Sequence, residues 1–197
     1  MRLFVHSVIY LLFTAGMVFA ADQRNTATVE NIQRIVIKYL PFIQANSKTW
    51  RFGERAGTPR LNVQDLTLPE IVVVDTQDAL NRLYLRYATE SELEGLDPDG
   101  NIPRIAAFYD PDSSTMFFHG EMDITDPYNI STVIHETIHH VQYANGLDAL
   151  VECESRLEDA AYGIQLEYLR SVGYDNKQRI TGLKWNRVLY SSCRKSR

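Results

Sequence analysis

Residues 131–146 read STVIHETIHHVQYANG and contain His135, Glu136 and His139 in the pattern H-E-x-x-H. Residues four apart lie on one side of an α-helix, so His135 and His139 can aim their imidazoles at one point, a geometry typical of zinc ligands. Glu136 follows the first histidine and is placed to take a proton from a water that the metal activates. The stretch therefore predicts a helix that carries a catalytic zinc site.

The apolar residues of this stretch have helical spacing and predict a face buried in the core, with a wet, polar side opposite. They are Ile130, Val133, Ile134, Ile138 and Val141. Asn129 is a suitable N-cap, and Asn145-Gly146 is a typical helix end. We therefore expect a single bounded helix.

A catalytic zinc ion usually has three protein ligands, so a third is needed. Residues 147–173 form a second helical pattern, in which Glu154, Glu158, Ala161 and Gln165 share one side. Its apolar positions are Leu150, Cys153, Leu157, Ala160, Ile164 and Leu169. A helical hairpin can return the Glu158 carboxylate to the two histidines. We take Glu158 as the third ligand and keep Glu154 as the alternative.

This arrangement resembles the gluzincin branch of zinc metallopeptidases. The resemblance covers roughly residues 105–169 and is carried by residues 107–110 (AFYD), the histidine motif and the glutamate helix. Residues 157–162 (LEDAAY) are similar to those of small secreted bacterial zincin-like proteins of unknown function. The resemblance implies a Zn²⁺ ion bound by His135, His139 and Glu158, with Glu136 as the catalytic carboxylate.

The expected function is that of a secreted zinc-dependent metallopeptidase acting on a peptide or protein substrate. Zinc would lower the pKa of a water, and Glu136 would act as the general base and pass the proton to the leaving amine. Two alternatives stay open. One is a secreted, non-catalytic zinc-binding or interaction protein with a degenerate site. The other is a metal-free structural module with ordinary surface histidines.

Three tyrosines are candidates to stabilise an oxyanion: Tyr109, Tyr143 and Tyr162. Tyr162 is favoured as a catalytic residue because it lies one turn beyond Glu158 on the same helical face. By resemblance, an extended substrate would pair with an edge strand, either residues 105–109 or residues 116–119.

Two further histidines lie near these segments. His119 is a possible extra ligand or transition-state donor, although a lone histidine in a loop more often faces solvent. His140 follows His139 directly, so on a helix it points about 100° away from it. We interpret neither as a ligand.

Residues 1–20 have a basic start, an apolar run and small residues before Ala20, which predicts a secretory signal peptide cleaved after Ala20. Residues 21–197 would then form one secreted or periplasmic domain without a stable membrane span. The formal net charge of −5 argues against a nucleic-acid partner. We interpret the basic terminal residues 194–197 as a solvated tail, and the oligomeric state stays open.

Cys153 and Cys193 are the only cysteines. In an oxidising compartment they could form a disulfide that closes a loop of about 40 residues and contributes roughly 3–4 kcal/mol. A Cys-His nucleophile is the competing use of Cys153. Its position on an apolar helical face favours a structural role.

The remaining patterns predict an α+β fold. We expect helices over residues 26–44 and from Thr76 to Tyr87, a buried strand over residues 70–75, and a packed C-terminal helix within residues 175–193. Residues 102–110 and 115–119 predict a β-hairpin, residues 50–68 an irregular loop, and residues 97–101 a tight turn rather than a calcium loop. The architecture would be a minimal zincin-like domain with a small, mainly antiparallel sheet packed on the metal helix and the glutamate helix.

Overall fold

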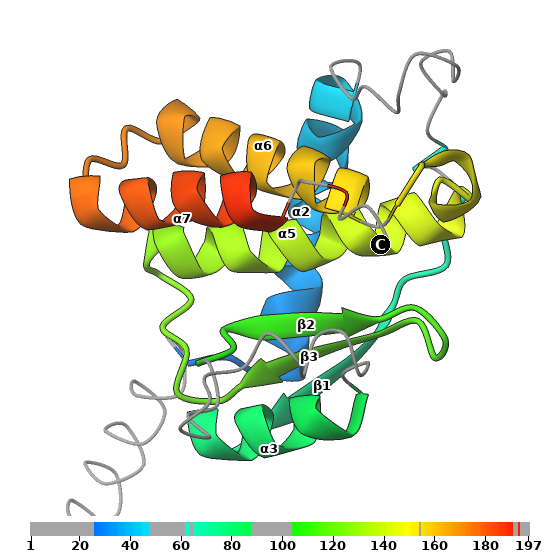
Figure 1. Ribbon diagram of the computed structural model, residues 1–197. Coiled ribbons are helices and arrows are strands. Elements are labelled where there is room, and N and C mark those ends of the chain that lie inside the picture. Colours follow the sequence, from blue (N-terminus) through cyan, green and yellow to red (C-terminus); the bar gives the residue numbers. More distant parts are fainter. Residues whose placement is uncertain are drawn as a thin grey trace, which may run out of the picture.

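A computed structural model describes residues 26–47, 62–63, 65–87, 104–153, 155–190 and 193. These residues form an α+β domain with five α-helices and a three-stranded sheet (Figure 1). In chain order the elements are α2 (Val29–Asn46), β1 (Glu70–Val74), α3 (Gln77–Tyr87), β2 (Ala107–Asp110), β3 (Thr115–His119), α5 (Pro127–Ala144), a 3₁₀ turn (Asp148–Leu150), α6 (Ser155–Ser171) and α7 (Lys177–Tyr190).

The sheet has the order β1-β3-β2 and is mixed rather than mainly antiparallel. β2 and β3 form the expected antiparallel hairpin, whereas β1 runs parallel to β3. A parallel pair requires a long crossover, and the segment containing α3 provides it. β3 is the central strand, so the hypothesis that residues 116–119 form a free edge for substrate is wrong.

The two faces of the sheet pack against different helices, because side chains alternate along each strand. Met116 and Phe118 of β3 point toward α2 and α5, where they join Ile32 and Val133 in one apolar cluster. Phe117 points the other way and packs with Phe108 and Leu80 beneath α3. Figure 1 shows α3 on the side of the sheet away from α5. The sheet therefore supports α5 from one side only.

α5 starts earlier than the sequence indicates. Asp126 is the N-cap, with its carboxylate accepting a hydrogen bond from the Tyr128 amide, and Pro127 occupies the first turn. The prediction of Asn129 as the cap is wrong, because Asp126 and Pro127 suit the N-cap and the first helical position and start the helix three residues earlier. The predicted end is confirmed, with Asn145 at the C-cap and Gly146 at a positive φ of 66°.

The expected solvent-facing side of α5 is also wrong. Every residue from Ser131 to Gln142 is buried, including all three residues of the histidine motif that carry chemistry. Figure 1 shows the reason: α5 runs through the middle of the fold, with α6 along one side and the sheet along another, and α2 also packs against it. The motif therefore lies in a protected interior.

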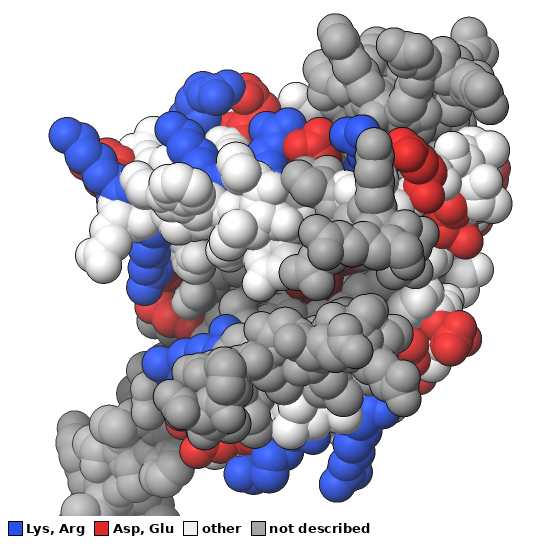
Figure 2. Space-filling model, in the orientation of Figure 1, with Lys and Arg blue, Asp and Glu red and all other residues white. Residues whose placement is uncertain are grey.

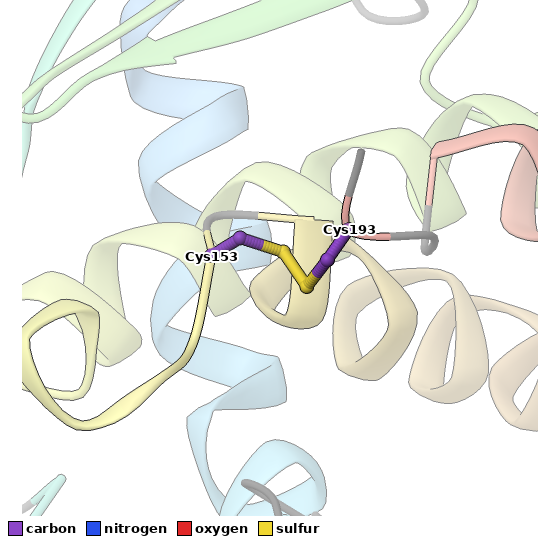
Figure 3. Close-up of a disulfide and its surroundings, with 2 residues drawn as sticks. All are labelled: Cys153 and Cys193. Carbon is purple, nitrogen blue, oxygen red and sulfur yellow. A yellow bond between two sulfur atoms is a disulfide. The ribbon is translucent and has the colours of Figure 1, made fainter. Parts of the chain in front are cut away.

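The helical pattern after α5 is divided into two parts. The 3₁₀ turn contains Leu150, which is exposed although the pattern places it in the core, and α6 begins only at Ser155. Cys153 lies between them and forms a disulfide with Cys193 (Figure 3). This bond fastens the end of the chain to the segment just before α6.

Other predicted elements are confirmed in the described residues. α2 continues through Pro41. β1 is a strand, although only Ile71 in it is fully buried. The Thr76 hydroxyl caps α3 by accepting a hydrogen bond from the Ala79 amide at 3.2 Å. α7 differs from its prediction, because Leu183 is its only buried residue.

Some predictions fall on residues outside this description. They are the signal peptide (1–20), most of the 50–68 segment, the turn at 97–101, Glu154 and the basic tail (194–197). Within the described ranges, no helix combines the length and apolar character needed to cross a bilayer.

Candidate metal centre

Three side chains from two helices converge in the interior. His135 and His139 come from the middle of α5, and Glu158 comes from the first turn of α6. The Nε2 atoms of the two histidines lie 3.1 Å apart. Glu158 Oε2 is 3.3 Å from His135 Nε2, and Glu158 Oε1 is 3.2 Å from His139 Nε2. The structure thus brings together the three residues that the sequence selects as ligands.

These separations fit a small divalent cation. Two donors that each lie about 2.0–2.1 Å from an ion, at a tetrahedral angle, are roughly 3.3 Å apart. The three separations in the structure are 3.1, 3.2 and 3.3 Å. Two imidazoles and one carboxylate are also a donor set that zinc uses in catalytic sites. The residues present therefore fit the ion that the motif implies.

Two buried glutamines fix the protonation of the histidine rings. His135 Nδ1 donates to Gln165 Oε1 at 3.1 Å, and His139 Nδ1 donates to Gln142 Oε1 at 3.0 Å. An amide oxygen can only accept a hydrogen bond, so both Nδ1 atoms carry the proton. Both Nε2 lone pairs then point at the common centre.

The orientation of each glutamine is itself fixed. The Gln142 amide nitrogen donates to the Leu157 carbonyl at 2.9 Å, and the Gln165 amide nitrogen donates to Ser131 Oγ at 3.0 Å. Ser131 in turn donates to the Tyr128 carbonyl at 2.6 Å. Each chain of donors and acceptors runs in one direction only, so the glutamines cannot flip without losing a bond.

The centre consequently consists of acceptors alone. Two neutral Nε2 atoms and a carboxylate within hydrogen-bond distance would repel one another unless a cation or a proton lies between them. Without a metal, a proton on His139 relieves this repulsion. Burial lowers the pKa of His139, but the Glu158 carboxylate has the larger effect and raises that pKa to about 9. Burial raises the pKa of Glu158, but the two histidines hold it well below its usual value.

Glu136 lies beside this centre without being part of it. Its side chain is buried, and its carboxylate makes no hydrogen bond with any residue in the described ranges. Burial raises its pKa, against the opposing effect of His135 and His139. Ionisable groups whose pKa is shifted by burial are concentrated at functional sites.

Tyr162 covers the centre from α6. Its ring lies edge-on to that of His135, with ring centroids 4.5 Å apart. Burial, followed by the charges of Glu158 and Glu136, raises the pKa of its phenol, so it remains a proton donor at neutral pH. The structure therefore places Tyr162 beside the ligands and the candidate base.

The other candidates lie elsewhere. His119 alternates with Phe118 and so shares the α3 side of the sheet with Phe117, away from α5. Its Nδ1 is 4.0 Å from Glu121. His119 is therefore not part of this centre, as expected, but its side chain is only 12% exposed, so the expectation that it faces solvent is wrong.

His140 has a structural role rather than a solvent-facing position. It is buried, and its Nε2 donates to the Thr67 carbonyl at 2.8 Å. Its Nδ1 then accepts from the Tyr109 hydroxyl at 3.3 Å. Tyr109 and Tyr143 pack together there, with ring centroids 5.9 Å apart. This cluster ties β2 and the segment before β1 to α5.

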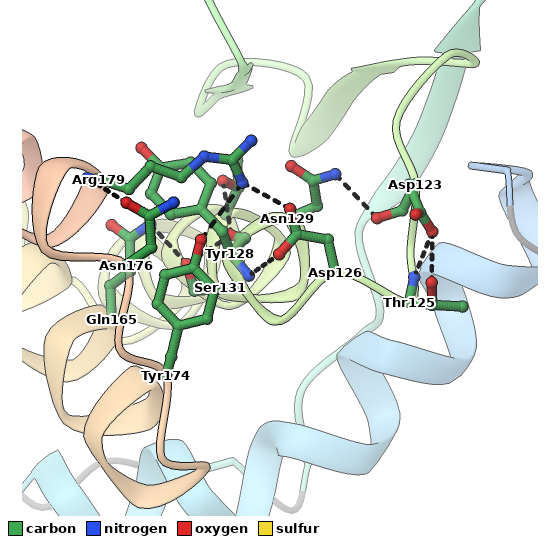
Figure 4. A network of polar contacts seen from close by, with 11 residues as sticks. Asp123, Thr125, Asp126, Tyr128, Asn129, Ser131, Gln165, Tyr174, Asn176 and Arg179 are labelled. Atoms are coloured by element: carbon green, nitrogen blue, oxygen red, sulfur yellow. Dashed lines mark hydrogen bonds and ion pairs between the residues drawn. The ribbon is translucent and has the colours of Figure 1, made fainter.

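A polar network anchors the start of α5, as Figure 4 shows. Arg179 of α7 forms an ion pair with the N-cap Asp126 at 2.5 Å, and its guanidinium lies 4.7 Å from the centre of the Tyr128 ring. Tyr128 also accepts the Ser131 hydrogen bond that continues through Gln165 to His135. The position of the first histidine is thus coupled to the packing of α7.

The surface is hollowed between the helical layer and the sheet layer, and acidic side-chain atoms are visible inside the hollow (Figure 2). In the described residues, His135, His139 and Glu158 are the only group of three or more metal-binding side chains that converge. One third of the Glu158 side chain remains exposed, whereas the histidines are almost fully buried. Small molecules from solvent would therefore reach the centre from the Glu158 side.

Sequence reasoning missed the roles of Gln142 and Ser131 and assigned none to Gln165. Gln142 follows His139 by three residues, so helical spacing could have suggested a local partner. Gln165 shares a helical face with Glu158 and Ala161, which was a weaker signal. Nothing in the sequence marks Ser131, because serine is common near helix starts.

A family model described as "Domain of unknown function (DUF6647)" matches residues 63–197, which include the whole centre. Neither the curated proteins nor the solved structures provide a match to the chain.

Proposed function

Because this chain belongs to the DUF6647 family, whose description names no activity, we propose from the site alone that it is a zinc-dependent metallopeptidase. The observation that carries the proposal is the convergence of two oriented imidazoles and a carboxylate beside Glu136, a second acidic residue that is only 6% exposed. A structural metal site would need only the two imidazoles and the Glu158 carboxylate. The Glu136 carboxylate is the additional group that a hydrolase requires as its general base.

Each residue has a separate role in the proposal. His135, His139 and Glu158 hold the ion, which supplies Lewis-acid polarisation of a water and of the scissile carbonyl. Glu136 takes the proton of that water and returns it to the leaving amine. Tyr162 donates a hydrogen bond to the carbonyl oxygen as negative charge develops on it.

The substrate is proposed to be an extended peptide. β2 pairs with β3 along one side, and its other side has no strand partner among the described residues. β2 also packs against α5 through Tyr109 and His140. A peptide that adds to this edge by main-chain hydrogen bonds would run beside the metal helix.

Export from the cytoplasm is part of the proposal. The Cys153–Cys193 disulfide supports it, because such bonds persist in oxidising compartments and are rare in the cytosol. Sequencing the N-terminus of the protein recovered from the periplasm or the medium tests it. A new terminus at Ala21 is expected, and an intact Met1 would contradict it.

The decisive test combines metal analysis with peptidase assays on a quenched peptide library. We expect about one zinc per chain, lost in both His139→Ala and Glu158→Ala. Glu136→Gln should keep the metal but lower the hydrolysis rate by roughly 10²–10⁴-fold. Zinc retained with no activity in the unmodified protein would favour the non-catalytic metal-binding alternative. No zinc after reconstitution would refute both and leave a metal-free structural module.

A further inference from the structure

α7 carries an apolar face that is largely exposed to solvent. Trp185, Val188 and Leu189 are 62%, 62% and 66% exposed, and Tyr190 is 56% exposed. Helical spacing places the first three together, opposite the buried Leu183. They therefore form a contiguous, exposed apolar surface. Surfaces of this kind usually mark an interaction site.

All the charged side chains of α7 are basic. Residues 177–197 contain seven Lys or Arg and no Asp or Glu, although the chain as a whole has a formal net charge of −5. Arg179 and Arg187 are used internally, in ion pairs with Asp126 and Asp159. Lys177 and Lys184 form no ion pair within the described residues and lie on the exposed part of α7. Figure 2 shows uncharged surface over α7 with Lys and Arg side chains on either side.

We propose that α7 is a docking surface for an anionic lipid membrane. Tryptophan and tyrosine beside aliphatic residues, flanked by lysines, have the composition of helices that lie in the membrane interface. Protein interfaces, by contrast, are depleted of lysine at their centre. A second copy of the chain is disfavoured, because a symmetric contact through α7 would place the lysines of both copies against each other.

The docking orientation has a consequence for the metal centre. The inner side of α7 packs on α6, which carries Glu158, and Arg187 of α7 pairs with Asp159 at 2.7 Å. The membrane would therefore bind the helical layer that bears the candidate site. The inference does not depend on the proposed activity, and its test requires neither metal nor substrate.

The test uses the fluorescence of Trp185 in the full chain. The protein has two tryptophans, so a Trp50→Phe background leaves Trp185 as the sole reporter. We expect a blue shift on mixed phosphatidylglycerol and phosphatidylcholine vesicles and none on phosphatidylcholine alone. Lys177→Gln with Lys184→Gln should weaken partitioning by about 25-fold, because each basic residue near an anionic surface contributes roughly fivefold. Leu189→Ser should weaken it by about tenfold.

Ile37→Ser is the matched control, because Ile37 is an apolar residue of α2 that is 51% exposed. The partitioning of the Ile37→Ser variant into anionic vesicles should be unchanged. All variants share the same N-terminus, so any membrane affinity of residues 1–20 cancels in the comparison. The proposal is overturned if Trp185 emission does not respond to anionic vesicles, or if the lysine substitutions have no effect. It is also overturned if the shift occurs without lipid and rises with protein concentration, since that would indicate a second copy.

Discussion

Replacing Gln165 with methionine should weaken zinc binding without unfolding the protein. Gln165 is buried, and its amide oxygen is the acceptor for His135 Nδ1 at 3.1 Å. Methionine has nearly the same length and can fill the space, but its sulfur is only a weak acceptor. The substitution therefore removes the group that fixes the tautomer of His135.

The expected loss of zinc affinity follows from the hydrogen bond that His135 forms in place of the one to Gln165. With no acceptor at Nδ1, the favoured tautomer carries its proton on Nε2, where Glu158 Oε2 lies 3.3 Å away. A hydrogen bond to a charged group contributes roughly 1.5–3 kcal/mol. That bond must be broken before Nε2 can bind a metal, so zinc affinity should fall by about 10–150-fold. This range agrees with the 10–100-fold typical of residues that orient metal ligands.

Zinc affinity is measured by competition with a chromophoric chelator, and the tautomer is read from ¹⁵N chemical shifts of the histidine rings in metal-free protein. Gln33→Met is the control, because Gln33 is exposed on α2. The zinc affinity of this variant should be unchanged. Gln142→Met should reproduce the effect at His139. Unchanged affinity in Gln165→Met, with the His135 proton still on Nδ1, would refute the reasoning.

Three predictions concern stability. The double variant Cys153→Ser with Cys193→Ser should have a free energy of unfolding about 4 kcal/mol lower than the unmodified protein, because the disulfide links residues that are 40 apart in sequence. Urea titrations without reductant measure this difference. The unmodified protein in reductant should match the double variant. Asp126→Ala should cost roughly 1–2 kcal/mol and Asn129→Ala clearly less, and the reverse order would restore Asn129 as the cap. Phe118→Ala should cost about 3–5 kcal/mol because this ring is fully buried, and a loss below roughly 1 kcal/mol in thermal unfolding would contradict the packing of the sheet on α5.

The sequence predicted the candidate centre better than it predicted the surroundings of that centre. His135, His139 and Glu158 are distinguished by residue type and helical spacing, and these local rules determine which way a side chain points. The burial of α5 on all sides could not be predicted in this way. It depends on α6 covering the polar side of α5, which is a long-range arrangement that periodicity does not encode.

The same distinction explains the other differences. The parallel pairing of β1 with β3 depends on the direction in which the chain returns after α3, and no local signal specifies that direction. The apolar residues of α7 have the spacing of a core face, so the pattern could not show that Trp185 and Leu189 face outward. The cap at Asp126 was predictable in principle, since Asp-Pro is a common helix start, but Asn129 competed as an equally suitable residue.

The disulfide has a consequence for how the protein withstands cleavage. It joins Cys153, just before α6, to Cys193, just after α7, so the two helices and the turn between them form a covalently closed ring. The turn at residues 172–176 is largely exposed, which makes it a site where an external protease can cut. A cut there would open the ring without separating its parts. Glu158 and Arg179 would remain on one covalently connected molecule until a reductant released them.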